Sequence, residues 1–316
     1  MNQEFANDVK AGLTAESKYL LPKYFYDARG SWLFQQIMQL PEYYLTKCES
    51  DVITNNTERA LKLFSRGNKR FNVIDMGVGD GLKTKILLEY LVGQKANFEY
   101  SAIDLSTAIM EILEDSINAA FPDMDYRPMN MDYFAALEQL AANSKKNVRK
   151  VLLFLGSNIG NFTNEETVAF LTKVKGYLQK GDLLIVGFDL KKRPEIIYKA
   201  YNDTKGTTAA FNLNLLHRIN SELGGNFKPN YFRFYPFYNP QNGELQSYLV
   251  SQKKQTVEIK ALDLTIEFDQ WEAIHTELSK KYTLNEIEDL AEQAGFKVEQ
   301  HLVDGKGYFV DTVLTV

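Results

Sequence analysis

FNVIDMGVGDGLKTKILLEYL, residues 71–91, is the stretch that decides the fold class of this chain. It predicts a strand, a turn that is rich in glycine, and a helix. Gly77, Gly79 and Gly81 lie in the turn, where the absence of a Cβ atom lets the backbone turn tightly and approach a ligand closely.

The same order of strand, turn and helix returns twice, at residues 98–117 and 151–178, and residues 181–190 supply a further strand. The run VLLFL, residues 151–155, is apolar throughout and is typical of a strand buried on both faces. Thr163 or Asn164 is suited to cap the helix that follows it. Alternating strands and helices of this length indicate a parallel sheet with right-handed crossovers.

Three other segments do not follow this pattern. Residues 1–60 are predicted to be mostly helical, and residues 196–286 combine helix-like with hairpin-like stretches. The C-terminal stretch 296–316 is predicted to form two strands around the turn at 304–307, an antiparallel hairpin. The expected fold is therefore α/β, with a Rossmann-like sheet that closes on an antiparallel hairpin.

Composition narrows the class of function. The chain has 316 residues, a net charge of −5 and a pI near 5.5, so we expect no general attraction to nucleic acid or to anionic membranes. No apolar run approaches the roughly 18 residues of a membrane span, and the N-terminal residues do not resemble a signal peptide. Cys48 is the only cysteine, which is typical of a reducing cytoplasm. A soluble cytoplasmic protein is expected, and a monomer is plausible.

Metal binding is not expected. The single cysteine excludes a thiolate cluster, and the three histidines, His217, His275 and His301, show no spacing typical of metal ligands.

The glycine turn indicates the class of cofactor. A dinucleotide-binding turn has the spacing G-x-G-x-x-G, whereas this one has G-x-G-x-G. Together with Asp104 at the end of the next strand and the C-terminal hairpin, the turn resembles that of S-adenosylmethionine-dependent methyltransferases. The resemblance implies that Asp104 accepts hydrogen bonds from the ribose hydroxyls and that Asp132 and Tyr133 bind the adenine. The alternative interpretation is that the glycines form an ordinary strand-to-helix turn and that Asp132 is a solvated carboxylate in a loop.

A second polar turn, GSNIGN at residues 156–161, follows the strand that is expected beside the first one. Ligands of open parallel sheets lie beyond the carboxyl ends of the strands, so this turn should face the methyl group that is transferred. The amide of Asn161 can accept from an amine and donate to a carboxylate, which suits an amino acid. A DNA amino-methyltransferase would need a DPPY-like turn and a basic face, and the sequence has neither.

A closer resemblance covers essentially the whole chain. Residues 23–49, 73–85, 154–162, 200–216 and 274–282 are similar, in this order, to the histidine-specific Nα-methyltransferases of ergothioneine biosynthesis. The resemblance implies a cofactor-binding domain at 61–195 and 287–316, and an α+β substrate-binding domain at 1–60 and 196–286. The implied cofactor contacts are Gly77, Lys83, Asp104, Asp132 and Tyr133, and Gly79 of the same turn is expected to let the cofactor approach closely. The implied substrate contacts are Tyr26, Tyr43, Gly156, Asn161, Tyr201, Ser247, Glu277 and Ser279.

Glu277 and Ser279 are two residues apart, so on a strand they point to one face. Together they can bind an imidazole, although an exposed acid beside a serine is the ordinary interpretation of such a pair. Tyr26, Tyr43 and Tyr201, each taken singly, are more often residues that pack in the protein than residues that bind a ligand. Ser247 departs from the family pattern, which commonly has a methionine there, and this leaves a roomier or wetter pocket for the side chain of the substrate.

The predicted reaction is transfer of a methyl group from S-adenosylmethionine to the neutral α-amine of an amino acid, most directly L-histidine, repeated to the trimethylated betaine hercynine. Tyr26, Tyr43 and Asn161 are the predicted catalytic residues, which orient the lone pair of the amine. Two alternatives stay open. One is a methyltransferase for another amino acid or a small amine, and the other is a ligand sensor without catalytic activity.

Overall fold

The structure is a computed structural model that describes residues 3–67, 70–79, 81–142 and 148–316. It contains two compact units, and each unit combines segments that are far apart in the sequence. The first unit comprises Met1–Tyr44 and Lys192–Lys280, and the second comprises Leu45–Lys191 and Lys281–Val316.

The second unit is built on a seven-stranded sheet in the order β11-β12-β5-β4-β1-β2-β3. The strands are β1 (Arg70–Met76), β2 (Phe98–Ile103), β3 (Tyr126–Met129), β4 (Val148–Phe154), β5 (Leu183–Asp189), β11 (Lys297–Val303) and β12 (Phe309–Thr315). The helices are α3 (Tyr44–Phe64), α4 (Leu82–Gly93), α5 (Thr107–Ala120), α6 (Tyr133–Ala142), the 3₁₀ turn η2 (Asn158–Asn161), α7 (Asn164–Lys175) and α10 (Leu284–Gln293).

Strand register places the two predicted turns on one edge of this sheet. β1 lies between β2 and β4 and pairs with both in parallel, with Asp75 opposite Leu153 on β4. The turns after β1 and β4 therefore leave the sheet at the same carboxyl edge. β12 pairs antiparallel with β5 and with β11, which confirms the predicted α/β class and its C-terminal hairpin.

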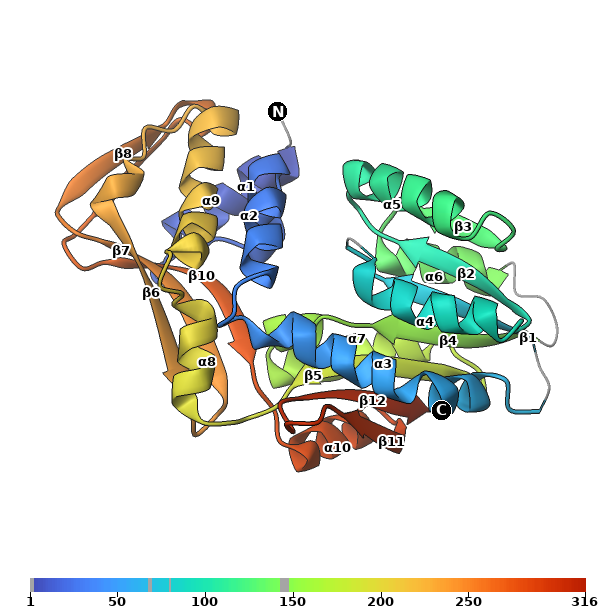
Figure 1. Ribbon diagram of the computed structural model, residues 1–316. Helices are drawn as coiled ribbons and strands as arrows, with labels where there is room; N and C mark the ends of the chain where they lie inside the picture. The colour runs from blue at the N-terminus through green and yellow to red at the C-terminus, as the bar shows by residue number, and fades with distance from the viewer. Residues whose placement is uncertain (1–2, 68–69, 80, 143–147) are drawn as a thin grey trace. The chain divides into compact units, whose positions relative to one another are not determined.

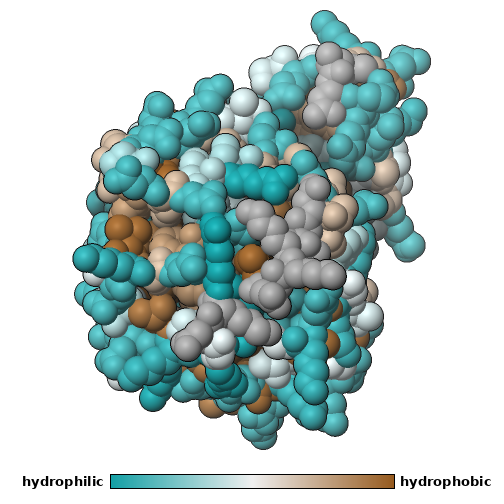
Figure 2. All heavy atoms as spheres, turned by 90° about the vertical axis from the view of Figure 1, so that its right-hand side faces the viewer, coloured by the Kyte–Doolittle hydropathy of each residue, from teal (hydrophilic) through white to brown (hydrophobic). Residues whose placement is uncertain are grey.

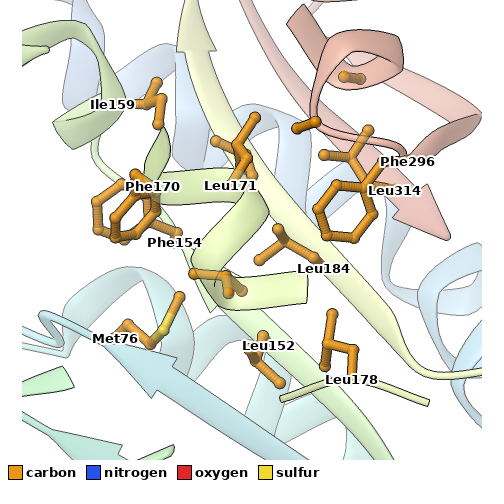
Figure 3. Close-up of a cluster of buried hydrophobic side chains, with 14 of the residues drawn as sticks. Met76, Leu152, Phe154, Ile159, Phe170, Leu171, Leu178, Leu184, Phe296 and Leu314 are labelled. Atoms are coloured by element: carbon orange, nitrogen blue, oxygen red, sulfur yellow. The ribbon is translucent and has the colours of Figure 1, made fainter. Parts of the chain in front are cut away.

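Helices cover both faces of the sheet. On one face, α6, α7 and α10 contribute to a buried apolar cluster around Leu152 and Leu184, and Figure 3 shows Phe154, Phe170 and Leu171 pointing into it. On the other face, α3 and α4 lie in front of the strands in Figure 1, and their side chains meet strand residues around a small cavity. Of the two predicted caps, Thr163 or Asn164, it is Thr163 that caps α7, with a capping box.

The boundary between the units differs from the predicted one at residue 60. The structure divides the chain after Tyr44, because most of α3 packs on the sheet of the second unit. Phe64 at the end of α3 contacts Phe71 edge to face, with the ring centroids 5.6 Å apart. Arg149 donates hydrogen bonds to the carbonyl oxygens of Leu63 and Phe64, at 2.6 and 3.1 Å. The other divisions fall after residues 191 and 280, near the expected 195 and 286.

The first unit has a three-stranded antiparallel sheet in the order β10-β7-β6 and a hairpin of β8 and β9. Alternate residues of β7, among them Leu245 and Leu249, are buried, as expected for a sheet with one covered face. The strands are β6 (Phe232–Asn239), β7 (Glu244–Ser251), β8 (Gln255–Ile259), β9 (Leu264–Phe268) and β10 (Ala273–Lys280). The helices are α1 (Gln3–Thr14), η1 (Pro22–Phe25), α2 (Ala28–Met38), α8 (Pro194–Tyr201), α9 (Thr207–Leu223), η3 (Pro229–Tyr231) and η4 (Lys260–Leu262).

Polar side chains dominate the view of the surface in Figure 2, where brown apolar atoms form only small patches between them. Within the described ranges, no helix combines the length and the apolar character that crossing a membrane requires.

Candidate active site

The turn after β1 has a backbone that favours glycine. Gly77, Gly79 and Gly81 have φ angles of 77°, 56° and 67°, all in the left-handed region. The N–H of Gly77 donates to the carbonyl of Ile103 on β2, at 2.8 Å, which ties the turn to the neighbouring strand. A Cβ atom on Gly79 would have no atom within 4 Å among the described residues, its neighbours in the chain aside. The backbone of this turn is therefore open to a ligand at Gly79.

Asp104, which follows β2, lies against this turn. Its Oδ2 accepts from the N–H of Gly79 at 3.3 Å, and its Oδ1 accepts from the N–H of Ser106 at 3.0 Å. A carboxylate can accept more hydrogen bonds than these two. The structure thus places the predicted ribose-binding carboxylate beside the glycine turn.

Asp132 and Tyr133 lie at the start of α6. The Asp132 side chain is exposed, and its Oδ1 accepts from the backbone N–H groups of Phe134 and Ala135 at 2.9 and 3.3 Å, so it caps the helix. Tyr133 packs edge to face on Phe154 with the ring centroids 6.0 Å apart. Burial raises the pKa of the Tyr133 hydroxyl well above its usual value, so Tyr133 stays a neutral donor.

Tyr133 also closes one side of the glycine turn. A Cβ atom on Gly77 would lie 2.5 Å from the Tyr133 Oη, which is closer than real contacts allow. Glycine at 77 is therefore required twice, by its positive φ and by this hydroxyl.

Lys83 lies in the first turn of α4, and its ammonium forms an ion pair with Glu49 of α3. Glu49 also accepts a hydrogen bond from the backbone N–H of Gly156, at 2.6 Å, and its side chain is 1% exposed. Glu49 is not among the residues that the sequence predicted for the site. The signal was present, because Leu45, Cys48, Glu49 and Val52 occupy one face of a helix and only Glu49 is charged.

The turn after β4 is held rigidly. Ser157 has a φ of 57°, and its hydroxyl accepts from the N–H of Asp189 at 3.2 Å. The Tyr282 hydroxyl donates to the carbonyl of Ile159 at 3.2 Å. These contacts fix the 3₁₀ turn η2, which ends at the predicted substrate residue Asn161.

The first unit brings four predicted substrate residues into one chain of contacts. Tyr26 and Tyr43 both contact Phe34 edge to face, with centroid separations of 5.5 and 6.2 Å. Tyr43 contacts Tyr201 at 6.4 Å, and the Tyr201 hydroxyl is hydrogen-bonded to that of Ser279 at 2.7 Å. Tyr26 remains 45% exposed, so its ring is accessible.

Glu277 and Ser247 lie directly opposite each other on β10 and β7. A bulge between His275 and Glu277 shifts the register, and from Glu277 onward the pairing is regular, so Glu277 and Ser279 share a face. Ser247 is fully buried, and its hydroxyl has no hydrogen-bond partner within the described part of the chain. Thr276 in the bulge is fixed by the Asn212 side chain, whose Oδ1 accepts at 2.7 Å.

Metal ligands do not gather anywhere in the described ranges, where no group of three His, Cys, Asp or Glu side chains is arranged to hold an ion. The ring nitrogens of His301 contact a hydroxyl and a carboxylate: they lie 3.0 Å from the Thr312 hydroxyl and 3.2 Å from Glu288.

Comparison with known proteins gives whole-chain matches. The sequence profile of the family described as "Histidine-specific methyltransferase, SAM-dependent" matches residues 5–316. The histidine N-alpha-methyltransferase of Mycolicibacterium smegmatis is 33% identical over 96% of this chain and 92% of its own length. Ergothioneine biosynthesis protein 1 of Schizosaccharomyces pombe is 28% identical over 86% of this chain and 36% of its own. The L-tryptophan methyltransferase of Psilocybe serbica is 25% identical over 93% of this chain and 87% of its own.

Proposed function

Because this chain belongs to the family of histidine-specific, S-adenosylmethionine-dependent methyltransferases, we propose that it methylates the α-amine of an amino acid, L-histidine, with S-adenosylmethionine as the methyl donor. The observation that carries the proposal is the whole-chain family match, together with an open glycine turn that has Asp104 beside it.

The residues of the second unit fit this methyl donor. The open backbone at Gly79 gives the adenosyl group close access, and Asp104 offers acceptors for two hydroxyls. Asp132 and Tyr133 would bind the adenine from the start of α6, and the Lys83 ammonium would pair with the carboxylate of the donor. Because Gly77 has no Cβ atom, the turn leaves room for the Tyr133 hydroxyl beside it.

S-adenosylmethionine supplies a methyl group on a positively charged sulfur, which is a good leaving group without any activation by the protein. The work of the protein is then to position a neutral amine and to exclude water. Tyr26, Tyr43 and Asn161 would orient the lone pair of that amine, and Tyr201 would help to hold the carboxylate of the amino acid. The proton of the amine would leave through water or a tyrosine hydroxyl.

The imidazole of histidine would bind at Glu277 and Ser279. A carboxylate accepts the ring N–H, and a hydroxyl such as that of Ser279, which is hydrogen-bonded to Tyr201, can act as donor or acceptor. Repeated transfer would give the trimethylated betaine hercynine. The faces of Tyr26 and Tyr43 suit the quaternary ammonium of such a product, since aromatic rings attract cations.

A different amino acid is the second candidate substrate. Ser247 favours it, because its buried hydroxyl has no partner in the described part of the protein and is suited to a polar group of a ligand. A relative 25% identical to this chain is an L-tryptophan methyltransferase, so a substrate other than histidine is compatible with similarity at this level. A ligand sensor on the same fold is the third candidate.

Purified protein incubated with labelled S-adenosylmethionine and each amino acid in turn distinguishes the three. We expect label in histidine, and mass spectrometry of the product would count the methyl groups. Preferred transfer to another amino acid would retire histidine and keep the class of enzyme. Binding without transfer to any amino acid would support the sensor.

We also propose that the partners of the protein are its small-molecule substrates and that it acts in the cytoplasm. A chain with one buried cysteine forms no internal disulfide and is suited to a reducing compartment.

A further inference from the structure

Glu49 joins three elements of the second unit through one carboxylate. It comes from α3, it accepts the N–H of Gly156 after β4 on Oε1, and it pairs through Oε2 with the Lys83 ammonium of α4. With a side chain that is 1% exposed, it has no access to bulk water. A buried carboxylate that uses both oxygens in this way fixes the groups around it.

The sheet makes room for this carboxylate. Gly187, on β5, lies beside it, and a Cβ atom there would come within 2.4 Å of the Glu49 Oε1. Gly187 has an ordinary strand conformation, so its backbone geometry does not explain why this position is a glycine. The space beside Gly187 is occupied by Glu49 and by the ring of Phe309.

Lys83 faces three acidic side chains from three elements, Glu49 of α3, Asp75 of β1 and Asp311 of β12. Burial opposes the charge on Lys83, but these acids outweigh it and raise the pKa of the ammonium, with Glu49 contributing most. Burial raises the pKa of the Asp75 and Asp311 carboxyls, so Glu49 is the main partner of Lys83.

The Lys83 ammonium also lies close to the turn after β4. A Cβ atom on Gly156 would be 3.3 Å from the Lys83 Nζ, so a side chain at 156 would crowd the ammonium. Glu49 therefore holds a cation and a backbone amide side by side, at the carboxyl edge where the turns after β1 and β4 leave the sheet.

We propose that Glu49 is a positioning residue for the methyl donor: it orients the Lys83 ammonium toward the carboxylate of the amino-acid portion of S-adenosylmethionine and anchors the Gly156 turn beside it. The inference rests on the proposed function, and it adds a residue that does not itself touch a ligand.

The test compares Glu49→Gln with the wild type by calorimetric titration. Glutamine keeps an acceptor for the Gly156 N–H and removes the ion pair with Lys83. We expect the Kd for S-adenosylmethionine to rise about tenfold, as for the loss of a charge-assisted contact. The Kd for 5′-methylthioadenosine, which lacks the amino-acid portion, should stay within about twofold of the wild-type value. A general disturbance of the fold would weaken both ligands alike and would contradict the proposal.

A double-mutant cycle locates the effect. In a Lys83→Gln background, Glu49→Gln should change the Kd for S-adenosylmethionine by less than about twofold, because the group through which Glu49 acts is gone. An undiminished effect of Glu49→Gln in that background would overturn the proposal. Glu58→Gln is the matched control, since Glu58 lies on the same helix, is exposed and pairs with Lys62. It should bind both ligands like the wild type.

Gly187→Ala provides a second variant if Glu49→Gln does not fold. The added methyl displaces the Glu49 carboxylate without changing any charge, so it should weaken S-adenosylmethionine selectively as well. Equal affinity of wild type and Gly187→Ala for S-adenosylmethionine would count against the proposal. Wild-type protein that binds no S-adenosylmethionine at all would overturn the proposed function itself, a result separable from a failure of Glu49 alone.

Discussion

Tyr201 at the end of α8 and Ser279 on β10 are joined by a hydrogen bond of 2.7 Å between their buried hydroxyl groups. Tyr201→Phe removes one partner and should raise the KM for the amino acid roughly two- to tenfold, corresponding to about 0.5–1.5 kcal/mol. Steady-state rates at saturating S-adenosylmethionine measure it. Tyr198→Phe is the control on the same helix, because Tyr198 is 39% exposed and bonds only locally to Asn202 among the contacts described. Identical KM values for all three proteins would remove Tyr201 from the substrate site.

Glu277→Ala tests the imidazole contact. If Glu277 accepts the ring N–H, the KM for histidine should rise by one to two orders of magnitude, since a hydrogen bond to a charged group contributes about 1.5–3 kcal/mol. Other amino acids in the panel should be affected less. Glu267→Ala, an exposed glutamate on β9, is the matched control and should leave the kinetics unchanged. A uniform loss for every substrate would place Glu277 outside the side-chain pocket.

Gly77→Ala tests the glycine turn. The methyl group would meet the Tyr133 hydroxyl at 2.5 Å, and the positive φ adds strain of roughly 1–2 kcal/mol. We expect weaker binding of S-adenosylmethionine by calorimetry. Gly77→Ala should cost less affinity in a Tyr133→Phe background than in the wild type, because the colliding oxygen is gone. Additive losses in the double variant would contradict the steric account.

Lys281 and Asp189 form an ion pair of 2.9 Å in which both side chains are 0% exposed. Asp189→Asn should lower the free energy of unfolding by about 3–5 kcal/mol, because it removes the carboxylate that pairs with a buried ammonium. Asp189→Asn combined with Lys281→Met should lose less than the single variant. Urea titration followed by circular dichroism measures both. Glu58→Gln breaks an exposed pair instead and should have no measurable effect.

Asp75 gives a dependence of stability on pH. Burial raises the pKa of its carboxyl from 3.8 to about 6, although hydrogen bonds from Thr84 and Tyr100 and the charge of Lys83 oppose the change. The folded state then binds more protons than the unfolded state between about pH 4 and pH 6. The contribution of Asp75 to the free energy of unfolding therefore falls as the pH rises through that range. The free energy of unfolding of the wild type minus that of Asp75→Asn should fall by up to about 3 kcal/mol from pH 4 to pH 7. A difference that does not vary with pH would show that burial leaves this carboxyl unperturbed.

The sequence by itself determined the parts of the protein that depend on local pattern. These local signals are the apolar runs, the spacing of Gly77, Gly79 and Gly81, and the capping residue Thr163. Each of them depends only on residues nearby in the sequence, so they specify strands, the glycine turn and the start of a helix independently of the rest of the fold. The order of these elements also fixed the parallel sheet, because crossovers in such sheets have one hand. Asp104 was predictable for the same reason, since it ends the strand beside the turn.

The tertiary structure alone decided which distant side chains meet. The boundary at Tyr44 and the role of Glu49 depend on how α3 packs, because the helix sequence marks a face for burial but does not say that the sheet of the second unit covers it. The link from Tyr43 to Tyr201, across more than a hundred residues, likewise follows from packing within the first unit. The periodicity of a segment predicts which of its faces will be buried. It does not predict which element will cover that face, because this depends on how closely the side chains of the two elements pack together in the folded protein.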